Sequence, residues 1–393
     1  MTIALDLRRL PFHLTRNQRI LLKEALKAPE TPRNALADIV GISAPSAMRA
    51  VRPLVEAGIL QERRGDPDGR GKPPGLVQVM PNKLVLLGIS ISSSRVRVLL
   101  SDIAGADLTM LEDVQEWTDA AKQLATVDAL VAQALDANKD AILVGAGIVV
   151  QGFFISRGKR FAARWDMEGW AAIDLHAHME TRLGVPATIR NDGKALAVHV
   201  AQEQPYRHFF CIGIGTGIGG GLVSEGRLIE GRFGNAGEIG QIFTDTAARP
   251  IEARFLEASG CSDWSEWDGF EALSNSQSQV LKAWLDTAAH SIGQAAGIAL
   301  ALLDFEAVYL CARIPEDILE ALARRIYIAP LGQNIAGEDG PTNPPPKVIA
   351  YPLAHLAKLA SQMAKREFLN GVAPPQHQDH PAPVSQTGEF WSA

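Results

Sequence analysis

Residues 212–242 read IGIGTGIGGGLVSEGRLIEGRFGNAGEIGQI, and this glycine-rich stretch says more about the fold than any other part of the chain. Glycines at this density permit a sharp turn, or let backbone amides approach a phosphate. Apolar residues on both sides predict two strands. A strand rather than a helix follows the glycines, and the lysine of a P-loop is missing. Taken alone, the stretch favours a tight hairpin, with a phosphate-binding loop as the alternative.

Outward from this hairpin, strands alternate with helices along most of the chain. Apolar runs predict strands within 84–102, 142–152, 187–191 and 307–315, and helical spacing predicts helices over 119–137, 276–303 and 315–326. Such alternation is typical of an α/β protein. The length of 393 residues allows more than one core. We therefore expect a two-lobed body, with a first lobe over 83–200, a second over 201–372 and a disordered tail over 373–393.

The first 82 residues have a different pattern, with three short helices followed by two short strands. Helices are expected at 15–27, capped by Thr15, at 33–40, and from Ser43 to a stop at Gly58. The strands ILQERR and LVQVM enclose a loop rich in Gly, Pro and basic residues. Three helices and a basic wing predict a winged helix-turn-helix over 1–82, whose third helix enters the DNA major groove.

The third helix also predicts which side chains meet DNA. Its apolar stripe is expected to be buried, which leaves the opposite face and the wing for contacts with bases and phosphates. Pro53 lies inside this helix, and we expect a kink there because proline removes a backbone hydrogen bond. The basic residues could equally be solvated surface charges. The predicted DNA-binding residues are Ser43, Pro45, Ser46, Arg49, Arg52, Arg70 and Lys72.

The charge distribution agrees with a DNA-binding head. The whole chain has a net charge of −6, but residues 1–82 hold 13 Lys and Arg against 8 Asp and Glu, which leaves +5 there and −11 on the rest. Lys and Arg that neutralise phosphates supply most of the non-specific affinity for DNA. The sequence therefore predicts that the head, and not the body, contacts nucleic acid.

Composition excludes several other classes of protein. The three cysteines at 211, 261 and 311 are too far apart for a zinc ribbon or a disulfide framework. The apolar stretches are too short to span a bilayer, and the N-terminal residues do not read as a signal segment. We expect a cytoplasmic protein with no membrane partner, no bound metal and no cofactor.

Several of these motifs together resemble the ROK family, which unites repressors and sugar kinases. The resemblance rests on the stretch 212–242, on GIVVQG at 147–152 and on RNDGKALA at 190–197. The segment GISAPSAMRAVRPLVEAGIL at 41–60 is similar to the DNA-binding module of the family's regulators. The resemblance implies a two-lobed, actin-like ATPase body with a ligand cleft between its lobes.

The resemblance also implies a set of ligand-binding residues. Asp192, beside Asn191, occupies the position of the kinases' catalytic base, and Glu238 that of a sugar-binding glutamate. Gln241 replaces a histidine that joins a zinc-binding cysteine cluster in the family, and that cluster is absent here. Glu257 matches a further sugar-contacting glutamate. Read without the resemblance, Asn191 and Asp192 could be a helix cap, and Glu257 a surface charge on a short helix.

The nucleotide-binding elements depart from the pattern of the family's kinases. Ser90 stands in place of an acidic residue, and Ser92 and Ser93 stand in place of glycines. Cys311-Ala312 replaces a Gly-Gly pair, and residues 361–363 read Ser-Gln-Met where small residues are expected. Because phosphoryl transfer depends on positioning phosphates and Mg²⁺, we expect no catalytic residue and no kinase activity.

The sequence thus predicts a DNA-binding transcription regulator, a repressor of sugar metabolism, whose kinase-derived cleft senses a sugar. The expected partners are operator DNA, a small-molecule sugar and a second copy of the chain, in a homodimer or homotetramer. Two alternatives remain: an active sugar kinase with an accessory DNA-binding head, and a regulator that responds to an effector other than a sugar.

Overall fold

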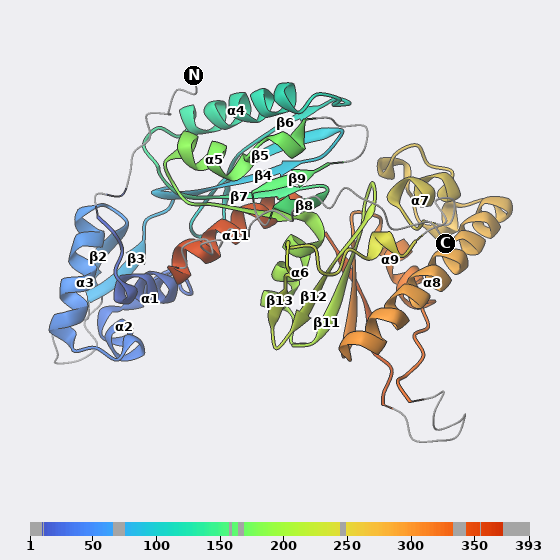
Figure 1. The fold of residues 1–393 in the computed structure, drawn as a ribbon. Helices are drawn as coiled ribbons and strands as arrows, with labels where there is room; N and C mark the ends of the chain where they lie inside the picture. The colour runs from blue at the N-terminus through green and yellow to red at the C-terminus, as the bar shows by residue number, and fades with distance from the viewer. Residues whose placement is uncertain are drawn as a thin grey trace, which may run out of the picture.

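The computed structural model shows an N-terminal head attached to a larger body of two lobes (Figure 1). Both lobes are α/β, as expected from the alternation of strands and helices. The predicted tail at 373–393 lies outside the described residues. None of the described helices is long and apolar enough to cross a membrane. The structure describes residues 10, 12–65, 75–156, 159–163, 169–243, 249–332, 343–353 and 355–371.

The head is a winged helix-turn-helix, as the sequence predicts. Thr15 begins the first helix with a capping box: its hydroxyl accepts from the Gln18 amide and its own amide donates to the Gln18 side chain. Gly41 ends the second helix in the left-handed conformation that glycine favours. A small antiparallel sheet in the order β1-β3-β2 follows. The elements are α1 Arg16–Ala25, β1 Thr31–Pro32, α2 Arg33–Val40, α3 Ala44–Glu56, β2 Leu60–Arg64 and β3 Gly75–Val79.

Two details of the head concern single residues in its helices. Ile39 follows Leu36 by three residues, a spacing that would turn it inward, but its side chain is 56% exposed while Ala37 is buried. An eight-residue helix has only two turns, so a small rotation decides which residue meets the core. In addition, α3 continues through Pro53 to Glu56, so the proline does not end the helix, and the kink there stays a prediction. The missing amide lies in the last turns, where little of the helix follows it.

The two lobes of the body are built on sheets of the same design. In each sheet, an antiparallel three-stranded meander is extended by two parallel strands, giving the orders β10-β7-β4-β5-β6 and β13-β12-β11-β14-β15. This confirms the two-lobed, actin-like body. The first lobe contains β4 Leu84–Ile91, β5 Arg95–Asp102, β6 Asp107–Val114, α4 Ala120–Asp136, β7 Ile142–Val150, β8 Phe153–Ser156, β9 Arg160–Ala162, η1 Trp170–Ala172, α5 Leu175–Leu183 and β10 Ala187–Asn191.

The second lobe begins directly after β10. Its core lies between the sheet and the long helix α8, which packs on it through an apolar face that includes Leu281, Leu285 and Ile292. The elements are α6 Asp192–Glu203, β11 Phe209–Ile214, β12 Ile218–Ser224, β13 Arg227–Ile229, η2 Ile239–Gln241, α7 Glu252–Ser259, η3 Trp264–Glu266, η4 Phe270–Ala272, α8 Asn275–Leu303, β14 Ala307–Ala312, α9 Glu316–Ala323 and β15 Lys347–Pro352.

The last described helix, α11 Leu356–Asn370, returns to the first lobe. Chain order assigned these residues to the second lobe at 201–372, but α11 packs against β4 and β7. The contact is backbone to backbone: a Cβ at Gly88 would lie 2.0 Å from the Ala357 carbonyl oxygen, and one at Gly147 would lie 1.8 Å from that of Ala360. No side chain fits at either position, so these glycines let the helix lie flat on the sheet.

Gly147→Ala should therefore destabilise the protein, by about 3 kcal/mol, because neither strand nor helix can move away without disturbing the core. The measurement is the midpoint of urea unfolding. Gly297→Ala is the matched control, because Gly297 lies within α8 and no atom lies within 4 Å of a built Cβ. The free energy of unfolding of this variant should rise by about 0.5–1 kcal/mol. An unchanged midpoint for Gly147→Ala would refute the close packing of α11.

Candidate functional site

The exposed face of α3 has the features of a DNA-reading surface. Ser43 caps the helix, and its hydroxyl lies 3.0 Å from that of Ser46. Pro45 is exposed in the first turn, where its missing amide removes no helical bond. Arg49 is exposed and donates to the Ser46 hydroxyl at 3.2 Å, which orients its guanidinium along the helix. The first turns thus present hydroxyls and a guanidinium, the groups that bind base edges and phosphates.

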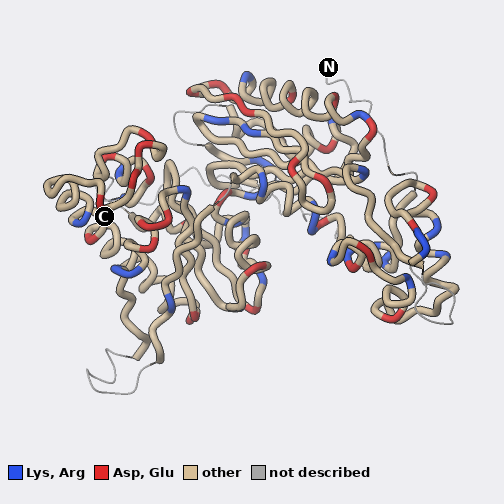
Figure 2. Tube along the Cα trace, turned by 180° about the vertical axis from the view of Figure 1, so that it is seen from behind, with Lys and Arg blue, Asp and Glu red and all other residues tan. Residues whose placement is uncertain are grey.

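Arg52 lies one turn further along this face and forms an ion pair with Glu56 at 2.8 Å. Both side chains are exposed, so the pair is weak and the guanidinium can exchange its partner for a phosphate. Arg70 and Lys72 of the wing lie outside the described residues. Figure 2 shows Lys and Arg positions along the trace of the head, with Asp and Glu positions interspersed among them. The DNA-contact roles of all these residues stay predictions.

Sequence reasoning missed Met48 on the same surface. Its side chain is 55% exposed, and it is spaced three residues after Pro45 and four before Arg52. Residues at these spacings share one face of a helix. An exposed apolar side chain on a recognition helix can contact a thymine methyl group. The helical spacing alone could have identified it.

The second candidate site lies at the junction of β10 and α6, where one lobe passes into the other. Asn191 caps α6, since its side-chain oxygen accepts from the Lys194 amide at 3.0 Å. Its amide nitrogen donates to the Glu238 carboxylate and to the Gly152 carbonyl. Asn191 therefore caps the helix and contacts Glu238 at the same time. Residues from β10, from the end of β7 and from the segment before η2 meet here.

Lys194 is a member of this cluster that sequence reasoning did not assign. The side chain is fully buried, and its ammonium donates to Glu238 at 2.7 Å and to the Gly220 carbonyl at 2.8 Å. A buried ammonium is stable only when such partners compensate for lost solvation. Lys194 and Asn191 bind the same oxygen of Glu238, which fixes the carboxylate in one orientation.

Asp192 is the first residue of α6 and lies beside this network. Its carboxylate accepts from the Gly193 amide at 2.8 Å. The pKa of Asp192 is raised to about 6, mainly by burial and to a smaller extent by the charge of Glu238, while the Gly193 amide and Lys194 act in the opposite direction. A carboxyl group with this pKa exchanges its proton close to neutral pH.

Three glycines hold the cluster together, and they explain the glycine-rich stretch. A Cβ at Gly193 would lie 2.4 Å from the Gly220 amide nitrogen, and a Cβ at Gly220 would lie 2.6 Å from the Gly237 carbonyl oxygen. We call this contact of three backbones the glycine crossing. The stretch forms an antiparallel hairpin of β11 and β12, in agreement with the hairpin interpretation.

Two further contacts join the lobes close to the cluster. Asn235 forms two hydrogen bonds with the backbone of Phe154 in β8, at 2.8 and 2.7 Å. Gln151, at the end of β7, bonds to the hydroxyl of Thr216 in the hairpin at 3.1 Å. Neither residue was identified from the sequence, because an amide in a loop carries no pattern of its own.

Gln241 and Glu257 are not brought into this network in the structure. Gln241 is exposed in η2. Glu257 is exposed on α7 and forms an ion pair with Arg254 at 2.8 Å. No contact of the described residues joins Glu257 to Asn191 or Glu238. Their assignment to the ligand site stays a prediction.

The turn at Ser92, which the resemblance aligns with a phosphate motif of the kinases, is hydrogen-bonded to neighbouring protein groups. The Ser92 hydroxyl donates to the Arg95 carbonyl at 3.1 Å, and the Ser92 carbonyl accepts from Gln123 at 2.7 Å. Trp170 in turn donates to Gln123 at 3.0 Å. The hollow beside this turn measures about 10 Å³, which is the space of a single water molecule. Cys311 and Ala312 are also fully buried in β14.

The described part of the chain contains no group of three His, Cys, Asp or Glu residues that could hold a metal ion. The site therefore consists of carboxylates, amides and one ammonium, groups that hydrogen-bond to hydroxyls in fixed directions.

Comparison with known proteins relates both parts of the chain to described families. Residues 14–61 match the family described as winged helix-turn-helix DNA-binding, and residues 87–270 match the ROK family. An uncharacterized protein of Sinorhizobium fredii is 25% identical over 81% of this chain and 83% of its own length. The xylose repressor of Bacillus spizizenii is 24% identical over 58% of this chain and 60% of the repressor.

Among solved structures, a ROK family transcriptional regulator described as a homolog of the Escherichia coli MLC protein matches with a TM-score of 0.64. The match covers 91% of this chain and 98% of the regulator at 16% identity, which supports the fold from the head through both lobes.

The raised pKa of Asp192 predicts a pH dependence of stability. The folded value of about 6 exceeds the ordinary value of 3.8, so the folded state keeps a proton that the unfolded state has released. The contribution of Asp192 to the free energy of unfolding is therefore fully present below the ordinary value and is lost as the pH rises through about 6.

The measurement is the free energy of unfolding in urea from about pH 4 to about pH 7, for the unmodified protein and for Asp192→Asn. The variant cannot titrate at this position, so its curve should lose less stability across this range. Parallel curves would show that burial does not raise this pKa.

Proposed function

Because the chain joins a winged helix-turn-helix DNA-binding domain to a ROK-family body, we propose that it is a transcription regulator that represses genes of sugar metabolism. A small sugar bound between the lobes controls its affinity for operator DNA. Since its target is DNA, we place it in the cytoplasm.

The observation that carries this proposal is the exposed face of α3. Its apolar side is buried in the core of the head, through Ala47, Val51 and Leu54. The other side presents Met48, Arg49 and Arg52, which are exposed among the described residues. In a winged helix-turn-helix this face enters the major groove.

The cluster around Asn191, Asp192 and Glu238 supports a sugar as the effector. Amides and carboxylates are the usual partners of sugar hydroxyls, because they donate and accept in fixed directions. Only one oxygen of Glu238 is engaged by Asn191 and Lys194, so the second oxygen can accept from a ligand. The similarity to xylose repressors also favours a sugar as the effector.

A chain of contacts connects this cluster to the head. α6 begins at Asp192 and packs against α11, and α11 packs against α1 of the head. Arg19 of α1 donates to the Phe368 carbonyl at the end of α11 and lies 5.4 Å from the Phe368 ring. We propose that sugar binding closes the lobes, moves α11 and so reorients the head.

An active sugar kinase is the second candidate, because the ROK family contains kinases. Ser92 and Ser93 argue against it, because they stand where the kinases carry glycines that let the backbone approach phosphates. Ser90 also supplies no carboxylate for Mg²⁺. A regulator with an effector other than a sugar is the third candidate, favoured by the exposed Gln241 in place of histidine.

We propose a homodimer or homotetramer that binds a pseudo-palindromic operator, because two-fold symmetric proteins read two-fold symmetric sites. The surface of α8 supports association of copies. Ile298 and Leu302, one turn apart on this helix, are 51% and 77% exposed. Large exposed apolar side chains at such spacing mark a contact surface.

Arg49→Ala should reduce affinity for the operator by about 1–3 kcal/mol and relax the preference at one base position, because the guanidinium bonds to a base edge. The measurement is fluorescence anisotropy with a selected operator at fixed salt concentration. Arg324→Ala is the control, since Arg324 is also exposed but directly follows α9, outside the head. Equal affinity of both variants and the unmodified protein would contradict the assignment of α3.

Glu238→Gln should weaken sugar binding at least about tenfold, because a charge-assisted hydrogen bond to a ligand hydroxyl is lost. The measurement is titration calorimetry with a panel of pentoses and hexoses. Glu320→Gln, on the surface of α9, should leave binding unchanged. Absence of heat with every sugar would favour the non-sugar effector, and ATP-dependent phosphorylation of any hexose would favour the kinase.

A further inference from the structure

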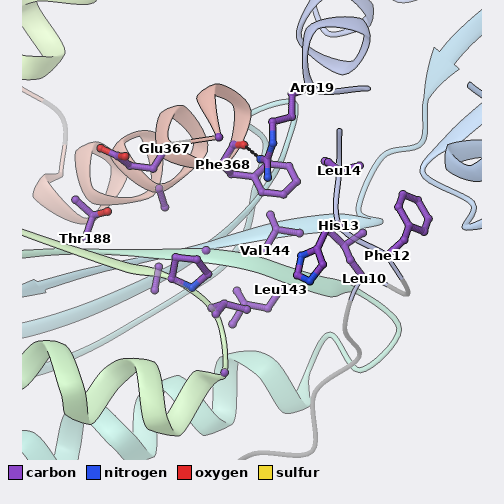
Figure 3. A pocket seen from close by; sticks show the side chains of 17 residues that line it. Leu10, Phe12, His13, Leu14, Arg19, Leu143, Val144, Thr188, Glu367 and Phe368 are labelled. Carbon is purple, nitrogen blue, oxygen red and sulfur yellow. Dashed lines mark hydrogen bonds between the residues drawn. The ribbon is translucent and has the colours of Figure 1, made fainter. Parts of the chain in front are cut away.

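A cavity of about 450 Å³ lies between the head and the first lobe (Figure 3). Its lining shares no residue with the cluster at Asp192. The head contributes the segment before α1 and Arg19. The body contributes β7, β10, the turn after α5 and the end of α11. Cavities of 300–1,000 Å³ with mixed lining are typical of small-molecule sites.

The walls of the cavity are mainly apolar, and both the head and the first lobe contribute to them. Phe12 and Leu14 precede α1, Leu143 and Val144 lie on β7, and Phe368 belongs to α11. Two aromatic rings within one apolar space suit a flat ring system, since aromatic groups gain from stacked or edge contacts in addition to burial.

One polar group of the cavity lacks a partner. The Oε2 atom of Glu367 is buried and has no hydrogen-bond partner among the described residues. Burial raises the pKa of Glu367, against the lowering influence of Arg190 and Arg366. An unpartnered buried carboxylate oxygen costs free energy. Because Glu367 as a residue lines the cavity, a donor bound there lies next to its carboxyl group. Thr188, on the edge strand β10, lies at the same end of the cavity as Glu367 (Figure 3).

The opposite charge is supplied by Arg19. One of its five N–H groups donates to the Phe368 carbonyl, and the guanidinium has further donors for a ligand acceptor. A charged ligand would satisfy either Glu367 or Arg19 and be repelled by the other. An uncharged molecule with both a donor and an acceptor fits both groups.

We propose that this cavity is a second effector site, which binds an uncharged aromatic molecule that carries a hydrogen-bond donor and an acceptor. Because the walls belong to head and body alike, the ligand holds the two in one orientation. Binding itself does not depend on the proposed function, whereas an effect on operator affinity does.

Three probes that share one ring test the charge requirement: indole-3-acetamide, indole-3-acetate and tryptamine, which are neutral, anionic and cationic. Titration calorimetry on the full chain should show the tightest binding for the amide. In Glu367→Gln, the acetate should gain affinity relative to the amide, because its repulsion by Glu367 is removed. Hydrogen exchange in 14–26 and 356–371 should slow when the amide binds.

Two substitutions that fill the cavity test whether the probes bind there. Thr188→Trp and Val185→Trp place a large ring in the cavity from half-buried positions and should each reduce affinity for indole-3-acetamide more than tenfold. Thr181→Trp, on the exposed face of α5, is the control and should leave it unchanged. Circular dichroism identifies variants that fail to fold. The proposal is overturned if no probe binds, if the charged probes bind as tightly as the amide, or if both folded filling variants still bind it.

Discussion

The candidate ligand site depends on the glycine crossing, where the backbones at Gly193, Gly220 and Gly237 touch. At this point the beginning of α6, the strand β12 and the segment that carries Glu238 come within contact distance without an intervening side chain. The close approach brings the Lys194 ammonium to both the Gly220 carbonyl and the Glu238 carboxylate. A methyl group at Gly193 or Gly220 would separate the segments and leave a buried ammonium without its partners, which is among the costliest defects in a protein interior.

The same principle acts a second time in the first lobe. Gly88 and Gly147 let α11 lie directly on β4 and β7, and the helix therefore belongs to the lobe that carries the head. One apolar cluster runs from Leu21 and Leu54 of the head through Leu86 of the sheet to Leu369 of α11. Head, sheet and helix are thus packed as one continuous core, and packed cores transmit a displacement because they cannot deform freely. This packing provides the physical route from the lobe junction to the DNA-binding helix that the proposed response to a sugar requires.

Much of this architecture could be predicted from local sequence signals. Thr15, Ser43 and Gly41 mark helix ends through their own side chains or conformation, and the glycine-rich hairpin is visible as a pattern. What could not be predicted depends on contacts between distant segments. Lys194 reads as an ordinary polar residue of a helix until Glu238 is placed beside it. The return of α11 to the first lobe depends on two glycines more than 200 residues away. Glu257, in contrast, matches a family position, yet it lies on the surface with Arg254.

The central claim is that one molecule both recognises a DNA site and alters that recognition when a sugar binds. The most direct test is the selection of genomic DNA fragments by the purified protein, repeated with each of a panel of sugars. The account predicts enrichment of a pseudo-palindromic site near genes of sugar uptake or breakdown, with recovery that changes in the presence of one sugar. Absence of any enriched site at moderate salt would contradict it, since phosphate contacts alone would then account for whatever binding remains.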